Sequence, residues 1–476
     1  MSLLLYNTRT RGKNDFLPID PKEVKIYSCG PTVYDFQHIG NMRTYIFVDI
    51  LRRVLEHKGY SVTHVENITD VGHLVSDGDT GEDKMEKGAK REGKSAWDIA
   101  DFYTHAFMQD INRLNIQHPH IWCKATDHIN EQIDLVKKLE EKGFTYAIKG
   151  DGIYFDTSKF PEYGSFARLN IDELEAGKRV EMVEGKKNIT DFALWKFSPK
   201  NVKREMEWDS PWGKGFPGWH IECSAMSMKY LGDRIDIHTG GIDHISVHHT
   251  NEIAQNNSAT GHNVVEHWMH GEFLVIGKNE RMGKSLGNFI TLQTLMDQGY
   301  DPLVFRFFVL NTHYRSPLHF HNSALDSAHE GLERIRQFIR ILKEREDQEN
   351  PDIEELISQT KKKFERAISD DLNIPQVLGS LFEMIKEINK QIDDKQNIPA
   401  GNILTLIAEM DRVLALSLLG HKTDDFPHEI AQLIAQRKAA RDTKDWESSD
   451  ALRNKLEKLG YSVEDTAKGQ RVVKRS

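Results

Sequence analysis

One segment, residues 24–40, constrains the fold more than any other, because a strand pattern there runs through a short loop into a helix. Residues Val24 to Tyr27 are mostly strand formers, and Gly30 ends the strand. From Asn41 apolar residues recur at helical spacing, and an apolar run at 61–65 predicts the next strand. This strand–helix–strand unit predicts a parallel sheet, because parallel strands need such crossovers.

Three residues of this segment fall where open α/β sheets bind ligands. Cys29 follows the strand directly, while His38 and Gly40 lie at the expected start of the helix. Strand ends and helix N-termini form a crevice in such sheets, and the exposed N–H groups there suit a phosphate. We therefore expect a site for a phosphate-containing ligand.

Length and composition place the chain among ordinary globular proteins. Its 476 residues predict two to four domains. The N-terminus has no signal-peptide pattern and no stretch approaches about 18 uninterrupted apolar residues, so we expect a cytoplasmic protein. The three cysteines, at 29, 123 and 223, are scattered and odd in number; this disfavours a disulfide framework but permits a shared metal or a reactive thiol.

The charge distribution changes sign at the C-terminal end. The net charge of −10 argues against binding nucleic acid by bulk electrostatics, yet residues 431–476 carry eleven Lys/Arg against seven Asp/Glu. A solvated basic tail is the simpler explanation of this excess. The Lys-rich segment 77–94 is likewise better explained as solvated surface than as a phosphate site.

Hydrophobic periodicity divides the chain into an α/β half and an α-helical half. We expect the α/β part at 1–119 and 216–321, interrupted by a turn-rich insertion at 120–215. Apolar residues at helical spacing then predict a bundle of four helices within 322–420. The last part, 421–476, predicts two more helices and a short strand near 471–473.

A candidate metal site combines two of the cysteines with a helix. His248 and Glu252 are four residues apart and share a helix face; His249 is three residues from Glu252 and can share it instead. Together with Cys29 and Cys223 they offer a tetrahedral zinc set. The alternatives are surface His and Glu side chains that meet only water, and cysteines that serve as small buried apolar residues.

A second candidate site is the Gly-bounded basic loop Arg281-Met-Gly-Lys-Ser-Leu-Gly-Asn288. It is either an exposed turn or a mobile phosphate clamp, in which Lys284 brings a positive charge to a triphosphate.

Several longer motifs occur along the chain in a fixed order. They are Cys29-Gly-Pro-Thr-Val-Tyr-Asp35, His38-Ile-Gly-Asn41, Asn67-Ile-Thr-Asp70, Asp191-Phe-Ala-Leu-Trp195, Gly218-Trp-His-Ile-Glu-Cys-Ser-Ala-Met226, His238-Thr-Gly-Gly-Ile-Asp243, His248-His-Thr-Asn-Glu252, Arg281-Met-Gly-Lys-Ser285, His313-Tyr-Arg-Ser316, Arg441-Asp-Thr-Lys-Asp-Trp446 and Asp450-Ala-Leu-Arg453. In these motifs the chain resembles the class I aminoacyl-tRNA synthetases, and in detail the cysteinyl-tRNA synthetase family, from residue 6 to 471. The resemblance implies a Rossmann-like parallel-sheet catalytic domain with an inserted connective domain, followed by an α-helical bundle and an anticodon-binding region.

For the metal, the resemblance implies one zinc ion per chain, held by Cys29, Cys223, His248 and Glu252. The thiol of the substrate cysteine would bind that zinc as thiolate. A site built around a metal–sulfur bond loses its main interaction with serine, which explains selectivity without an editing site.

For the reaction, the resemblance implies attack of the cysteine carboxylate on ATP to give cysteinyl-adenylate, then transfer to the 3′ end of tRNA(Cys). The residues implied in cysteine binding are Cys29, Thr69, Trp219, His238 and Asp243. Those implied in ATP binding are His38, Gly40, Asn41, Met282, Lys284 and Ser285, with His38, Asn41 and Lys284 as the catalytic residues and Mg²⁺ bound with ATP.

For tRNA, the resemblance implies that Arg441, Trp446, Asp450 and Asp465 read the anticodon, since unpaired bases are read by stacking and by hydrogen bonds to their edges. The alternative for Trp446 is a helix-packing residue. The partners are then tRNA(Cys), L-cysteine and ATP, without a membrane partner, and we expect a monomer.

The chain departs from the family pattern at four positions. Asn41 replaces a histidine, Arg281 and Gly283 replace Lys and Ser in the basic loop, and Thr250 replaces a common Glu. Two other functions stay open. A cysteine ligase acting on a small amine would not need residues 322–476, and a non-catalytic tRNA-binding paralogue would not need His38, Lys284 and the four metal ligands.

Overall fold

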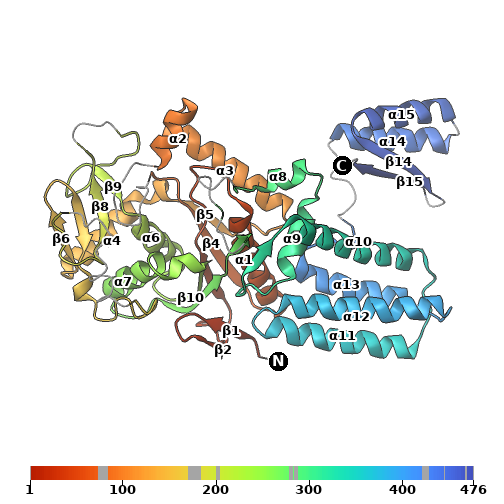
Figure 1. Cartoon of the computed structure of the whole chain (residues 1–476), viewed down its shortest axis with the longest axis horizontal. Helices are drawn as coiled ribbons and strands as arrows, with labels where there is room; N and C mark the ends of the chain where they lie inside the picture. The colour runs from red at the N-terminus through yellow and green to blue at the C-terminus, as the bar shows by residue number, and fades with distance from the viewer. Residues whose placement is uncertain are drawn as a thin grey trace.

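The computed structural model describes residues 2–72, 84–169, 184–199, 204–277, 282, 288–420, 428–443, 445–466 and 469–474. In these ranges an α/β half is followed by an α-helical half (Figure 1), which confirms the predicted fold class. None of the helices in this part of the chain is both long and apolar enough to cross a membrane.

A five-stranded parallel sheet forms the centre of the α/β half. Its strand order is β11-β10-β3-β4-β5. The strands are β3 (Val24–Ser28), β4 (Val62–Ile68), β5 (Ile121–Lys124), β10 (Ile235–Gly241) and β11 (Val265–Gly271). The chain runs outward from β3 to β5 and then returns to the other side of β3. The order therefore reverses between β3 and β10, the point at which open α/β sheets bind ligands.

Helices cover both faces of this sheet. They are α1 (Ile39–His57), α2 (Lys84–Glu92), α3 (Ala96–Arg113), α4 (Ile129–Glu141), α6 (Trp219–Leu231) and α7 (His248–Thr260). Alternate residues of β3 point to opposite faces: Ile26 belongs to the apolar cluster around α1, and Tyr27 to the cluster of α4, α6 and α7. Short α8 (Leu292–Asp297) and apolar α9 (Pro302–Leu310) lead toward the helical half.

The helix after β3 begins two residues earlier than the sequence predicts, because two side chains cap it. The backbone N–H of Asn41 donates to Nδ1 of His38, and the N–H of His38 donates to Oδ1 of Asn41, both at 3.1 Å. Glycine is required at position 30, where a Cβ would lie 1.7 Å from the carbonyl oxygen of Asn67. The loop from β3 to α1 is thus held close to the end of β4.

The insertion is built on a four-stranded antiparallel sheet of order β6-β7-β8-β9. Its strands are β6 (Thr145–Ile148), β7 (Gly152–Phe155), β8 (Phe192–Phe197) and β9 (Gly215–Pro217). The boundary predicted at residue 120 lies one strand too early, because β5 pairs with β4 in the parallel sheet. β5 is only four residues long, so it carries little periodic signal of its own. The other domain bounds stay a prediction.

Two small sheets border the α/β half. β1 (Leu4–Asn7) pairs with β2 (Gly12–Asp15), and β12 (Leu274–Ile276) pairs in parallel with β13 (Leu318–Phe320). β11 and β12 follow each other closely along the chain but belong to different sheets.

Four long helices lie side by side in the second half (Figure 1). They are α10 (Asn322–Glu344), α11 (Pro351–Ser369), α12 (Ile374–Asp393) and α13 (Ala400–Leu414), as the periodicity predicts. Their apolar faces are continuous with the cluster around α1, so bundle and sheet share one core. Arg306 of α9 is fully buried at this junction and donates to Asp49 of α1 (2.5 Å) and to the carbonyl of Leu414 (2.8 Å).

The C-terminal part folds around a small core of its own. α14 (His428–Asp442) and α15 (Trp446–Lys458) pack with the antiparallel pair β14 (Tyr461–Thr466) and β15 (Gly469–Lys474). Its core residues are Ile430, Leu433, Leu456, Tyr461 and Val463. The predicted single strand is thus the second strand of a hairpin.

Candidate active site

A cavity of about 870 Å³ opens where the strand order reverses. It brings together most of the described residues that the sequence assigns to cysteine, to ATP and to the metal. Those that line it are Cys29, His38, Asn41, Thr69, Trp219, Cys223, Asp243, His248 and Met282. Residues assigned to the amino acid and residues assigned to ATP, although far apart in the sequence, therefore line the same cavity.

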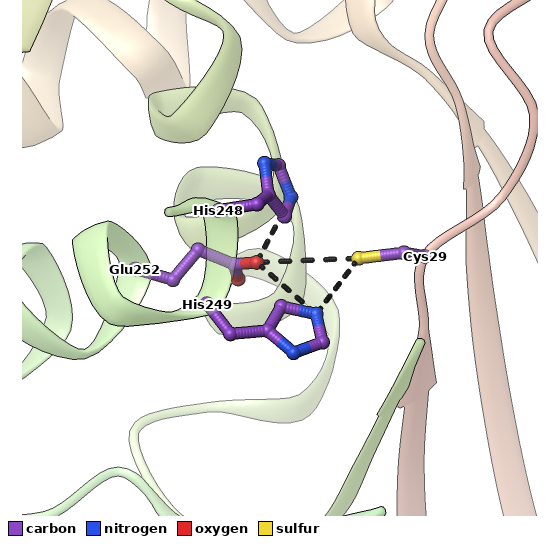
Figure 2. A group of neighbouring side chains, drawn as sticks. All are labelled: Cys29, His248, His249 and Glu252. Carbon is purple, nitrogen blue, oxygen red and sulfur yellow. Dashed lines mark hydrogen bonds and ion pairs between the residues drawn. The ribbon is translucent and has the colours of Figure 1, made fainter. Parts of the chain in front are cut away.

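Three of the candidate metal ligands, Cys29, Cys223 and His248, line one wall of the cavity, and the fully buried Glu252 does not line it. Figure 2 shows Cys29, His248 and Glu252 together with His249. Sγ of Cys29 lies 3.9 Å from Sγ of Cys223 and 4.0 Å from Oε1 of Glu252. The same Glu252 oxygen lies 3.0 Å from Nε2 of His248. All four side chains are buried.

These spacings fit a single zinc ion. Ligand bonds of about 2.0–2.3 Å in a tetrahedron place the ligand atoms roughly 3.3–3.8 Å apart. The three distances above, 3.0, 3.9 and 4.0 Å, each lie within about 0.3 Å of that range, and the ligand atoms of Cys29, His248, His249 and Glu252 all lie within 4.8 Å of one another. The donor set, two sulfurs with an imidazole and a carboxylate, is one that zinc accepts.

Four elements meet to form this wall. Cys29 follows β3, Cys223 lies in the second turn of α6, and α7 begins at His248 and presents Glu252 one turn later. Glycine is required at position 240, the end of β10, because a Cβ there would lie 2.7 Å from the ring of His249.

The structure leaves the choice between the adjacent histidines open. Nε2 of His249 lies 3.4 Å from Sγ of Cys29 and 3.8 Å from Oε1 of Glu252. Its Nδ1 is 2.7 Å from Nε2 of His270, and Nδ1 of His248 is 3.0 Å from Nδ1 of His220. Each imidazole thus has a partner on its second nitrogen, as metal-bound histidines do. Only His248 lines the cavity.

Burial and the neighbouring charges set the ionisation of this cluster. Burial raises the pKa of Cys29 well above its ordinary value, whereas the hydrogen bond from Cys29 lowers the pKa of Cys223 to about 7. Burial by itself raises the pKa of Glu252, but His238 and His248 outweigh it and lower that pKa below its usual range. The cluster therefore favours an ionised carboxylate and a thiolate close together, which attracts a cation.

The residues assigned to the amino acid divide into two layers. Thr69, Trp219 and Asp243 line the cavity, and the hydroxyl of Thr69 donates to Oε2 of Glu222 at 3.0 Å. His238 does not line it: this fully buried side chain stacks on Trp268, with Nε2 2.9 Å from Oε2 of Glu252. In this structure His238 therefore lies beneath the cavity and contacts the carboxylate of Glu252 instead of the cavity itself.

The other end of the cavity is the capped start of α1. His38 and Asn41 both face it, and the ring of Phe289 packs edge-on against that of His38 at 5.5 Å. Burial lowers the pKa of His38, so its imidazole is neutral at pH 7. Gly40 lies close to His38 and Met282, since a Cβ there would lie 3.0 Å from the ring of His38 and 3.3 Å from Cε of Met282. Arg281, Gly283, Lys284 and Ser285 lie outside the described residues.

The residues assigned to the anticodon lie at the opposite end of the chain. Trp446 begins α15 and is 55% exposed, which argues against a helix-packing role. The guanidinium of Arg441 lies 5.7 Å from the centre of its indole, and Asp450 is exposed one turn further along α15. Of Asp465 only the backbone is described; it pairs with Gln470.

Sequence reasoning did not assign several residues that line the cavity. His244 faces Trp219 and His248, and burial lowers the pKa of its imidazole to about 4. Its position between the motifs at 238–243 and 248–252 is the one sequence feature that could have indicated a role in the site. Lys87 and Arg91 of α2 also line the cavity, but nothing in their sequence context indicated it.

Comparison with known proteins first defines the class. Residues 15–330 match the family model for the class I (C) tRNA synthetase catalytic domain. The fold resembles that of Mycobacterium tuberculosis methionyl-tRNA synthetase in complex with methionyl-adenylate, with a TM-score of 0.58 over 90% of this chain and 96% of that one, at 14% identity. The fold is that of a class I aminoacyl-tRNA synthetase.

Curated relatives then narrow the family. The chain is 49% identical to cysteine–tRNA ligase 1 of Burkholderia lata, over 99% of this chain and 97% of that protein. It is 45% identical to the cysteine–tRNA ligase of Treponema denticola, over 98% of each. Residues 363–419 match a DALR domain, and 423–472 match the cysteinyl-tRNA ligase anticodon binding domain. The chain belongs to the cysteinyl-tRNA synthetases, which are ligases.

Proposed function

We propose that this chain activates L-cysteine with ATP to cysteinyl-adenylate and transfers it to the 3′ end of tRNA(Cys). The observation that carries the proposal is the single cavity with two different ends: thiols, an imidazole and a carboxylate at one, and the capped N-terminus of α1 at the other. Such a cavity can hold a thiol-bearing amino acid and a nucleotide in contact. The reaction between them then becomes effectively unimolecular, which lowers its entropic cost.

Zinc would be held by Cys29, Cys223, His248 and Glu252. Bound there, it would supply a borderline-soft Lewis acid that favours the thiolate form of the substrate sulfur. The chain's own contribution is orientation. His238 fixes the carboxylate of Glu252 through a 2.9 Å contact, and the ring of Trp219, 4.5 Å from that of His248, closes the space around the amino acid. Asp243 would then bind its ammonium group.

The nucleotide would lie at the start of α1. The N–H groups and dipole of a helix N-terminus favour phosphate, and the neutral ring of His38 can donate to a phosphate oxygen. Asn41 replaces the usual histidine and keeps the helix cap, so it holds His38 in place. Lys284 and Ser285, which follow Met282 in the sequence, would bind the phosphates from the basic loop, with Mg²⁺ bound to the ATP.

The C-terminal part would read the anticodon. An exposed indole with a guanidinium beside it offers one face for stacking and donors for base edges. This part supports the tRNA ligase over a cysteine ligase that acts on a small amine, which would have no use for it.

Two assays test this function. Purified protein should exchange pyrophosphate into ATP only with cysteine, and should charge tRNA(Cys) with cysteine but not serine. Lys284→Ala should reduce exchange severely. The control Lys361→Ala changes an exposed lysine of α11, far from the cavity in sequence and in the bundle, and should leave exchange unchanged.

Two results would favour the alternatives. Exchange without charging of any tRNA would support the small-amine ligase. No exchange by protein that carries zinc would support a non-catalytic paralogue. Metal analysis should find about one zinc per chain, lost in Cys223→Ser; a chain free of zinc that still rejects serine would overturn the proposed basis of selectivity.

A further inference from the structure

Exposed aromatic side chains gather beside the cavity, on α3 and on the loop before α1. Phe36, Trp97 and Phe102 are 44%, 44% and 45% exposed, although each is large and apolar. The rings of Phe36 and Phe102 lie 6.0 Å apart, and both contact the buried ring of Tyr103, at 5.0 and 5.1 Å. We call Phe36 and Phe102, with the basic side chains described next, the α2–α3 platform; Trp97, which also lies on α3, packs instead against the ring of Trp208 at 6.4 Å.

Basic side chains lie beside these rings. Residues 84–94 carry five Lys/Arg and two Glu, in a chain whose net charge is −10. Nζ of Lys94 lies 4.6 Å from the centre of the Phe102 ring and 3.4 Å from Oε2 of Glu92. The side chain of Arg91 is 51% exposed even though it pairs with Glu92 and Asp35. The platform therefore combines aromatic faces with local positive charge.

The platform is firmly attached to the catalytic domain. α2 and α3 pack through a small core that contains Met85, Ala89 and Ile99 and that includes Val33 and Ile68 of the sheet region. In Figure 1 these two helices lie together near β5, at the top of the view. The rings are therefore presented on a supported surface.

The platform is also continuous with the cavity. Phe36, Lys87 and Arg91 line the cavity, while Phe102 lies in ring contact with Phe36 but does not line it. A chain that enters the cavity past Phe36 would thus pass over Phe102 first. Its backbone would meet Lys87 and Arg91 on the way.

We propose that the α2–α3 platform binds the unpaired 3′-terminal nucleotides of the tRNA and guides them into the cavity. Single-stranded nucleic acid is bound by aromatic faces on which bases stack, together with basic groups that follow the phosphates. Phe36 and Phe102 supply the faces, and Lys87, Arg91 and Lys94 the charges. The proposal rests on the proposed function, and it names the surface that receives the substrate's acceptor end.

The test is a double-mutant cycle between Phe102 and the 3′ end. Affinity is measured for the full-length protein and Phe102→Ala, each with intact tRNA(Cys) and with tRNA(Cys) shortened by its unpaired 3′ nucleotides. We expect shortening to weaken binding by the original protein about tenfold, and binding by Phe102→Ala much less, because the stacking partner is already lost. Equal losses for both proteins would overturn the proposal.

Other measurements separate this proposal from the proposed function. Phe102→Ala should keep cysteine-dependent pyrophosphate exchange, because Phe102 does not line the cavity, and should slow transfer to tRNA. If neither protein supports exchange, the proposed function fails, whereas the binding cycle still reports on the platform. Leu17→Ala is the matched control, since Leu17 is apolar and 78% exposed; it should behave as the original protein.

Two further variants test whether a folding defect or another partner accounts for the result. Phe102→Leu keeps the apolar volume without the flat face, so it should show the same loss of coupling if Phe102→Ala folds poorly. Lys94→Gln should reduce the salt dependence of binding to intact tRNA. A platform that binds a shortened tRNA as tightly as the intact one, with unchanged salt dependence in Lys94→Gln, would instead be a surface for another partner, and the proposal would be wrong.

Discussion

The two adjacent histidines at the start of α7 offer the sharpest test of the candidate metal site. We compare His248→Gln with His249→Gln. Glutamine keeps much of the length and the hydrogen bonding of histidine, but its neutral amide is a poor ligand for zinc. Both side chains are buried within 3.8 Å of Glu252 Oε1, so each substitution serves as the matched control for the other.

The positions of the two histidines determine how much each substitution should change the zinc Kd. Zinc in a four-ligand structural site is bound with an apparent free energy of about 10–16 kcal/mol, or roughly 3 kcal/mol per ligand. Loss of His248 should therefore raise the zinc Kd by about two orders of magnitude. His249 would act from outside the ligand set, through its contacts with Cys29 and His270. Loss of such a supporting contact costs about tenfold.

The assay is competition for zinc with a chromophoric chelator, followed by metal analysis of the dialysed proteins. Melting temperatures establish that both variants are folded at the temperature used. Charging with cysteine and serine is then compared, and His248→Gln should lose discrimination together with zinc. If His249→Gln loses zinc and His248→Gln keeps it, the ligand is His249 and our assignment is refuted. If both keep it, α7 contributes no imidazole ligand.

Three further outcomes are expected elsewhere in the chain. Arg306→Met should lower the free energy of unfolding in urea by about 3–5 kcal/mol, because it leaves buried Asp49 without its 2.5 Å partner. Burial alone raises the pKa of Asp49, but Arg306 and Arg53 outweigh it and lower that pKa below the unfolded value. The resulting stabilisation is present above about pH 4 and is lost as the pH falls through the folded-state pKa, so Asp49→Asn should flatten the stability profile in acid. Trp446→Ala should raise the KM for tRNA about tenfold without changing pyrophosphate exchange, since stacking is worth about 1–3 kcal/mol per base; an unchanged KM would support a packing role.

Local patterns predicted the elements that contain strong periodicity. The strand at 24–28, the helix that follows it and the four bundle helices carry apolar residues at fixed spacing, and burial of one face enforces that spacing. Short β5 and β14 were missed or misplaced because four to six residues of mixed polarity carry little periodic signal. The early start of α1 depends on reciprocal hydrogen bonds between His38 and Asn41, which propensity does not reveal.

The candidate site was partly predictable for a different reason. The spacing of His248, His249 and Glu252 predicts a shared helix face, and the motifs imply a ligand set with His248. The choice between the histidines depends on where their side chains point. The structure places Nε2 of His249 near Sγ of Cys29 and Nε2 of His248 near Oε1 of Glu252, so both remain within reach of the site. The displacement of His238 to a layer beneath the cavity depends on its stacking with Trp268, which comes from a neighbouring strand.

By itself, the sequence determined the division into an α/β and a helical half, the family, and the chemical types of the ligands, because these depend on local spacing and on motifs. Only the tertiary structure decided which distant groups meet. Cys29 and Cys223 are 194 residues apart and come within 3.9 Å because α6, which carries Cys223, packs against β3, which Cys29 follows. The sequence predicts solvated surface over the Lys-rich segment 77–94, but Lys87, Gly88 and Arg91 of this segment line the cavity, where α2 packs on α3. The position of these basic residues beside the site results from long-range packing between elements, which local sequence patterns do not reveal.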